Sequence, residues 1–158
     1  VIEKIHQELK AYWGKGKVAD YIPALAEVEP KRYGIAIETL DGHSFQVGDA
    51  DIRFSIQSIS KVFALAMVTR HLGDRIWKFV GREPSGNPFN SLVQLEYEHG
   101  IPRNPFINAG ALVVTDRLMS LYEQPKDAIL QFVRGICMIN TLPARNVNMR
   151  TGTWLWAI

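Results

Sequence analysis

The segment from about Ser58 to His71 restricts the possible folds of this chain more than any other feature. Its apolar side chains recur on nearly every side of a helix rather than on one face. They are Ile59, Val62, Phe63, Leu65, Ala66, Met67 and Val68. A helix that is apolar nearly all round must be covered by other elements, so the pattern predicts a buried central helix. Gly73 follows at a position typical of a helix C-cap.

The part of the chain before this helix predicts another helix followed by a β-hairpin. Apolar residues at helical spacing between residues 1 and 13 indicate an amphipathic helix that ends at Gly14. Residues 33–40 have the composition of a strand, and Asp41-Gly42 is a dipeptide that favours a tight hairpin turn. Residues 43–47 would form the returning strand.

After the central helix, the pattern indicates two loops and two further helices. Gly, Pro, Ser and Asn residues mark the loops at residues 81–90 and 100–108. Asn108 suits the N-cap of the helix that follows it, and another helix is predicted near residues 126–134. Two strands followed by a run of helices predict an α+β fold.

Length and composition place the chain among globular proteins with one domain. It has 158 residues, of which 47% are apolar and 22% charged, and a formal net charge of +2. This small charge gives no reason to expect nucleic acid or an acidic membrane surface as a partner. A single Cys excludes an internal disulfide, and no apolar run reaches the about 20 residues of a membrane span. Because the chain begins with Val1 and carries no signal-peptide pattern, we expect a cytoplasmic protein whose start has been trimmed.

A serine and a lysine at the start of the central helix are the main candidates for catalysis. Ser58 and Lys61 are three residues apart, so their side chains lie on one helix face. A serine hydroxyl needs a base to act as a nucleophile, and a lysine buried in an apolar helix can supply a neutral amine. Backbone N–H groups at the helix N-terminus would also stabilise an oxyanion. The same four-residue motif arises often by chance, and Lys61 could instead extend to solvent or pair with an acid.

Other polar residues carry weaker signals. The four histidines are spread over different elements without ligand spacing, so we expect surface or cap residues rather than a metal site. They are His6, His43, His71 and His99. Tyr21 could be a buried phenol packed on the sheet, and an asparagine such as Asn108 is more often a helix cap than a substrate ligand. No glycine-rich segment has the pattern of a phosphate-binding loop.

Four longer blocks carry a more specific signal than the Ser-x-x-Lys motif. They are GKVADYIPAL at 16–25, FSIQSISKV at 54–62, GREPSGNPFN at 81–90 and PRNPFINAGA at 102–111. In this order and at this spacing they resemble the serine-dependent glutaminases, with the bacterial cytoplasmic branch as the nearest match. The resemblance covers residues 1–135, which we interpret as the N-terminal part of a glutaminase domain.

The resemblance implies a serine β-lactamase/penicillin-binding-like fold and the hydrolysis of L-glutamine to L-glutamate and ammonia through an acyl-enzyme. In it, Ser58 matches the nucleophile, Lys61 its base, and Tyr21 a tyrosine that lines the site and shares in proton transfer. Gln57 lies beside the nucleophile, and Asn108 matches an asparagine that binds the α-amino-acid end of the substrate. Neither a metal nor an organic cofactor is implied, and the expected assembly is a homo-oligomer, either a dimer or a tetramer.

The resemblance stops after residue 135, and residues 136–158 are interpreted as a divergent tail. Family members have about 300 residues, so a second active-site block, two tyrosines and a C-terminal Lys-Ser-Gly strand are missing. Back-translated and read from the third base of each codon, the segment 142–158 permits the string SPEREYADRNVAVGY, which resembles the missing block. We therefore hypothesise that the tail is frameshifted, which the nucleotide sequence of the gene tests. A naturally divergent tail is the alternative.

An incomplete site predicts little or no glutaminase activity for this chain, because loss of one oxyanion donor alone costs about 10²–10³ in rate. Two other functions are also considered. One is a different Ser-x-x-Lys acyl hydrolase, such as a β-lactamase or a penicillin-binding protein. The other is a non-catalytic fragment that associates with other subunits through an exposed sheet edge.

Overall fold

The computed structural model describes residues 1–91 and 93–136, so most of the tail expected at 136–158 lies outside the described residues. Over these two ranges, no helix is long and apolar enough to cross a membrane, and no three His, Cys, Asp or Glu side chains are grouped to hold a metal ion. The chain forms two compact units, Val1–Ser55 and a second that begins at Ile56.

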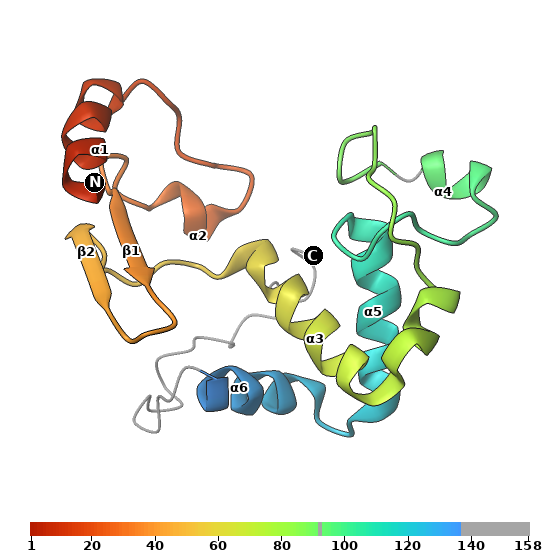
Figure 1. Ribbon diagram of the computed structural model, residues 1–158. Coiled ribbons are helices and arrows are strands. Elements are labelled where there is room, and N and C mark those ends of the chain that lie inside the picture. The colour runs from red at the N-terminus through yellow and green to blue at the C-terminus, as the bar shows by residue number, and fades with distance from the viewer. Residues whose placement is uncertain (92, 137–158) are drawn as a thin grey trace. The chain divides into compact units, whose positions relative to one another are not determined.

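The first unit contains the predicted helix and hairpin (Figure 1). Helix α1 spans Ile2–Leu9, continues as a 3₁₀ turn at Lys10–Tyr12, and is followed by the short helix α2 at Pro23–Ala26. Strands β1 (Gly34–Glu38) and β2 (Ser44–Gly48) pair antiparallel. Gly42 has a φ of +86°, a conformation that glycine adopts readily, so the predicted Asp41-Gly42 turn is confirmed.

His6 is buried in this unit, so the expectation that all four histidines are surface or cap residues is wrong. Its side chain is only 8% exposed. The ring stacks on Tyr33 with a centroid separation of 5.7 Å and meets Trp13 edge-on at 5.6 Å. A Cβ on Gly48 would lie 2.9 Å from His6 Cε1, which shows how closely β2 approaches the ring. An imidazole thus packs between the helix and the hairpin, at a place that apolar periodicity does not assign to the core.

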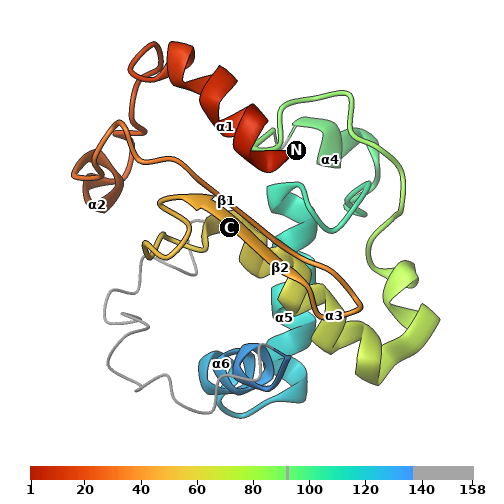
Figure 2. The same ribbon diagram turned by 60° about the vertical axis from the view of Figure 1, so that its left-hand side comes forward.

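The second unit is helical, and its core forms where three helices meet. Helix α3 spans Ser60–Leu72, α5 spans Asn108–Leu121 and α6 spans Pro125–Ile136, while α4 is a short helix at Val93–Tyr97. Figures 1 and 2 show α3 and α5 side by side, and α6 packs against both. The buried core consists of Ala64, Met67, Val68, Ile76, Val80, Val114 and Leu118. The predicted helices and the α+β class are confirmed.

Helix α3 is buried on one face only, which corrects the prediction of a helix buried all round. Met67 and Val68 are almost inaccessible, whereas Val62 is 51% exposed and Ala66 is exposed as well. The other elements of the second unit pack against one side of the helix, so its opposite side keeps apolar groups at the surface. Gly73 has a φ of +55° directly after the helix, which confirms the predicted C-terminal boundary.

Candidate active site

Ser58 lies at the entrance of the central helix. The 3₁₀ turn Gln57–Ile59 runs directly into α3, so the serine precedes the α-helix instead of forming its first turn. Ser58 is exposed at the surface of the second unit. A hydroxyl in this position is accessible to a small molecule, and the first N–H groups of α3 follow it in the chain.

Lys61 is one turn further along and is buried, with 4% of the residue exposed. Its Nζ donates a hydrogen bond to the Phe106 carbonyl oxygen at 2.9 Å and another to Asn108 Oδ1 at 2.8 Å. Neither acceptor carries a full charge, and burial lowers the pKa of this ammonium below its ordinary value. The lysine therefore neither extends to solvent nor pairs with an acid, the two structural alternatives considered for it.

Asn108 is not the N-cap that the sequence predicts. It is the first residue of α5, the N-cap position belongs to Ile107, and no side chain caps this helix. The Asn108 side chain instead accepts the hydrogen bond from Lys61, while its backbone N–H donates to the Phe89 carbonyl at 2.8 Å. The α5 N-terminus thus joins the lysine to the loop at 81–90.

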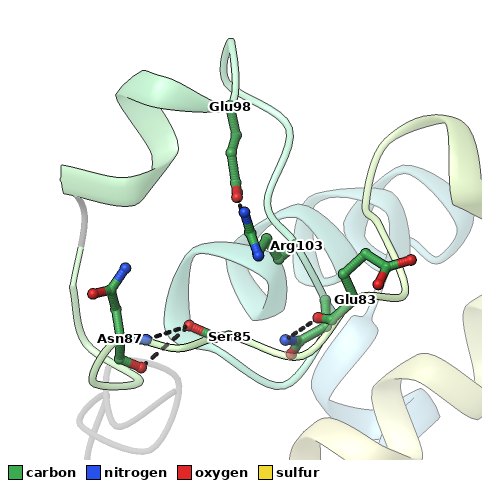
Figure 3. Close-up of polar contacts among 6 residues, drawn as sticks. Glu83, Ser85, Asn87, Glu98 and Arg103 are labelled. Carbon is green, nitrogen blue, oxygen red and sulfur yellow. Dashed lines mark hydrogen bonds and ion pairs between the residues drawn. The ribbon is translucent and has the colours of Figure 1, made fainter.

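The two predicted loops hold each other in place. Backbone N–H groups of Gly81 and Glu83 donate to the carbonyls of Pro102 and Arg103, at 2.7 and 2.9 Å. Figure 3 shows Arg103 pointing to Glu98, with which it forms an ion pair. A Cβ on Gly81 would lie 2.6 Å from the Arg103 carbonyl oxygen, so the two loops approach closely at this glycine.

Asn104 connects these loops through its side chain and was not among the candidates from the sequence. Its Oδ1 accepts hydrogen bonds from the N–H groups of Phe106 at 3.0 Å and Ile107 at 3.1 Å, and its Nδ2 donates to the Glu83 carbonyl at 2.9 Å. The signal was present in the sequence, because an asparagine followed by Pro105 is typical of an Asx turn.

The other predicted site residues are Tyr21 and Gln57, which differ in their exposure to solvent. Tyr21 is 76% exposed in the first unit, so the alternative of a buried phenol packed on the sheet is wrong, and its place in the site stays a prediction. Gln57 is half-buried next to Ser58 and has a φ of +44°. A left-handed conformation at a non-glycine residue stores strain, and such residues are enriched at functional sites.

Replacing Gln57 by Gly is expected to give a more stable chain than replacing it by Ala. Both variants lose the same side-chain contacts, but only Ala keeps a Cβ in the left-handed region, which costs about 1 kcal/mol. Urea unfolding of the two variants measures the difference in free energy. Equal stabilities would show that the backbone at position 57 is not strained.

Comparison with known proteins identifies the family of this chain. The family model described as Glutaminase matches residues 16–150, which runs past the boundary expected at 135. The chain belongs to the glutaminase family. It is 58% identical over 136 residues to a glutaminase of Marinomonas sp. (strain MWYL1), and 56% identical over 143 residues to one of Salmonella arizonae. These alignments cover 86% and 90% of this chain, and 45% and 46% of the relatives.

Solved structures show the same relationship in the fold. A probable glutaminase named ybaS aligns with a TM-score of 0.70 at 35% identity, covering 84% of this chain and 45% of its own. A probable glutaminase of Bacillus subtilis aligns with a TM-score of 0.59 at 30% identity, covering 74% and 38%. The predicted α+β, serine β-lactamase-like fold is confirmed. The chain spans about half the length of the curated glutaminases it matches.

Proposed function

We propose that this glutaminase-family chain supplies the nucleophilic half of a site that hydrolyses L-glutamine to L-glutamate and ammonia. The observation that carries the proposal is the environment of Lys61, which follows Ser58 by three residues and is held by two neutral acceptors. Family membership supports the reaction. The proposal extends to a cytoplasmic homo-oligomer that uses no metal and no organic cofactor.

The hydrogen bonds of Lys61 support its role as a base. A neutral amine has two N–H groups and one lone pair, and the Phe106 carbonyl and Asn108 Oδ1 accept two hydrogen bonds from Nζ. These two acceptors use both N–H groups of the neutral form, which leaves the lone pair available to the Ser58 hydroxyl. The lowered pKa of Lys61 increases the fraction of molecules in which that lone pair exists.

In the proposed reaction, Ser58 Oγ attacks the side-chain amide carbon of glutamine while its proton passes to Lys61 Nζ. Collapse of the tetrahedral intermediate breaks the C–N bond, and the proton on Lys61 passes to the departing nitrogen, so ammonia leaves. The ester that remains joins the γ-carboxyl group to Ser58. Water then attacks this ester while Lys61 takes its proton. Collapse of the second intermediate breaks the bond between the acyl carbon and Ser58 Oγ, the proton passes from Lys61 to Oγ, and glutamate leaves.

The remaining predicted residues are assigned to substrate binding. Asn108 Oδ1 accepts from Lys61, so its Nδ2 group can donate to the α-carboxylate of the substrate. Gln57 lies beside the nucleophile and would border the reacting amide. We assign Tyr21 to lining the site and to sharing in proton transfer, on the resemblance of its sequence block alone.

We expect this chain by itself to be weakly active or inactive, because it spans about half the length of its relatives. The test joins residues 1–136 to the remaining C-terminal part of the Marinomonas glutaminase and measures ammonia release from L-glutamine. The chimera is expected to hydrolyse glutamine, and Ser58→Ala is expected to lower the rate by at least about 10³-fold. Ser60→Ala, at a second serine of the same segment, is the matched control.

The ammonia assay and a labelling experiment separate the alternatives. A folded chimera that releases no ammonia, or one whose activity survives Ser58→Ala, would contradict the proposal. Covalent labelling of Ser58 by a penicillin would favour another Ser-x-x-Lys acyl hydrolase.

A non-catalytic role in association is the second candidate, and exposed apolar side chains favour it. Val62 on α3 and Leu112 and Met119 on α5 are all exposed. Apolar groups at a surface promote association with another chain. Co-purification of this chain with an intact glutaminase subunit, together with an inactive chimera, would support this candidate.

A further inference from the structure

We propose that Asn104 is a positioning residue for Lys61, because it fixes the peptide group that holds the lysine amine. The inference rests on the proposed function, in which Lys61 acts as the base. Asn104 belongs to the PRNPFINAGA block but was assigned no role by the sequence. Its side chain makes three hydrogen bonds, all of them to backbone groups.

The link between Asn104 and Lys61 is a single peptide unit. The carbonyl of Phe106 and the N–H of Ile107 belong to the same planar group. The N–H end donates to Asn104 Oδ1 at 3.1 Å, and the carbonyl end accepts from Lys61 Nζ at 2.9 Å. Because the group is rigid, its rotation would break both hydrogen bonds together. Asn104 therefore sets the direction in which the Phe106 carbonyl faces the lysine.

The turn around Asn104 is also fixed from the side of α5. A Cβ on Gly110 would lie 1.8 Å from the Asn104 carbonyl oxygen and 3.0 Å from Pro105 Cα, so the turn packs directly on the first residues of that helix. These residues include Asn108, the second acceptor of Lys61. The two acceptors of Lys61 therefore lie close together in the chain, one in the turn and one in the first residue of α5.

The third hydrogen bond of the Asn104 side chain connects the turn to the neighbouring loop. Asn104 Nδ2 donates to the Glu83 carbonyl, and the loop that contains Glu83 returns to the α5 N-terminus through the Phe89 carbonyl. The Phe89 ring centroid lies 6.0 Å from Lys61 Nζ. The Asn104 side chain thus connects the peptide group that holds the lysine to the loop beside it.

The pKa of Lys61 tests this inference, because a merely structural asparagine would not change it in a folded chain. The pKa is measured by NMR titration of the full 158-residue chain with ¹³C-labelled lysine, and Lys61→Arg identifies the signal. For Asn104→Ala we expect water to reach the freed amine and the pKa to rise by about one unit. That rise leaves tenfold less neutral amine at neutral pH.

Two further variants make the test specific. Asn104→Ser keeps a short acceptor that can bond the same N–H groups, so the pKa should return toward the wild-type value. Asn90→Ala removes an exposed amide of the adjacent loop and should leave the pKa unchanged. Circular dichroism establishes that each variant is folded, and Asn104→Leu, which has a similar shape but no acceptor, is titrated instead if Asn104→Ala does not fold.

An unchanged Lys61 pKa in a folded Asn104→Ala variant would overturn the inference. The same holds if a folded Asn104→Leu variant leaves the pKa unchanged. The titration does not depend on glutamine hydrolysis. A chimera that fails to release ammonia would therefore contradict the proposed function. The effect of Asn104 on the Lys61 pKa would still be measured separately by the titration.

Discussion

Replacing Lys61 by Met is expected to slow the covalent labelling of Ser58 by about 10²–10⁴-fold, the usual contribution of a positioned general base. Methionine keeps an unbranched apolar side chain in the buried space but removes the amine that would accept the serine proton. The measurement is the rate at which a fluorophosphonate phosphonylates Ser58 in the chimera, with fluoride as the leaving group. Mass spectrometry of the peptide that contains Ser58 follows the product.

The matched control for this prediction is Lys126→Met, at an exposed lysine of α6. It should leave the labelling rate unchanged. If Lys61→Met and the wild-type chain label Ser58 equally fast, Lys61 is not the base. A loss of labelling in Lys126→Met would show that the assay reports general damage to the protein.

The lowered pKa of Lys61 also gives a pH dependence whose sign can be stated. Labelling should speed up as pH rises through the folded-state pKa, because the neutral amine is the active form. Between the lowered folded pKa and the ordinary lysine pKa, the unfolded chain binds more protons than the folded chain, so stability rises with pH in this window. Urea unfolding across the window should show this slope in the wild type and a smaller one in Lys61→Met.

Gly110→Ala is expected to destabilise the second unit by at least about 2 kcal/mol, as overpacking of a rigid contact does. Alanine favours a helix over glycine by about 1 kcal/mol, so helix propensity alone predicts the opposite sign. The added Cβ would lie 1.8 Å from the Asn104 carbonyl oxygen, and this neighbour is backbone, which cannot rotate away. Either α5 or the turn has to shift, and Asn108 would move relative to Lys61.

Gly135→Ala provides the matched control, because Gly135 lies in α6 and a Cβ there would meet nothing within 4 Å. This variant should be as stable as the wild type or more stable by up to about 1 kcal/mol. Urea unfolding of both variants measures the contrast. A Gly110→Ala variant that is as stable as Gly135→Ala would show that the α5 start and the Asn104 turn are not packed as described.

Local signals were sufficient to predict most elements of the fold. The Asp41-Gly42 turn and Gly73 at the end of α3 both depend on a conformation that glycine favours, so they are visible in the sequence alone. Residues 81–90 and 100–108 were correctly predicted as loops from their turn-forming residues. The predicted pairing of the hairpin strands is confirmed as well.

Tertiary contacts account for what the sequence did not predict. Asn108 has the composition and position of an N-cap, but its side chain turns to Lys61, which comes from a helix 47 residues earlier. The bond from Asn104 Nδ2 to the Glu83 carbonyl depends on the pairing of two loops, which no local pattern reports. His6 is buried because an aromatic pair covers it, and apolar periodicity does not count a histidine as core.

Trapping the ester intermediate tests whether Ser58 is the nucleophile. The chimera is mixed with L-glutamine, quenched in acid within milliseconds to seconds, and digested for peptide mass spectrometry. We expect a γ-glutamyl group on the peptide that contains Ser58, and none in the Ser58→Ala variant. Ammonia release without any adduct on Ser58, or with the adduct on another residue, would contradict it.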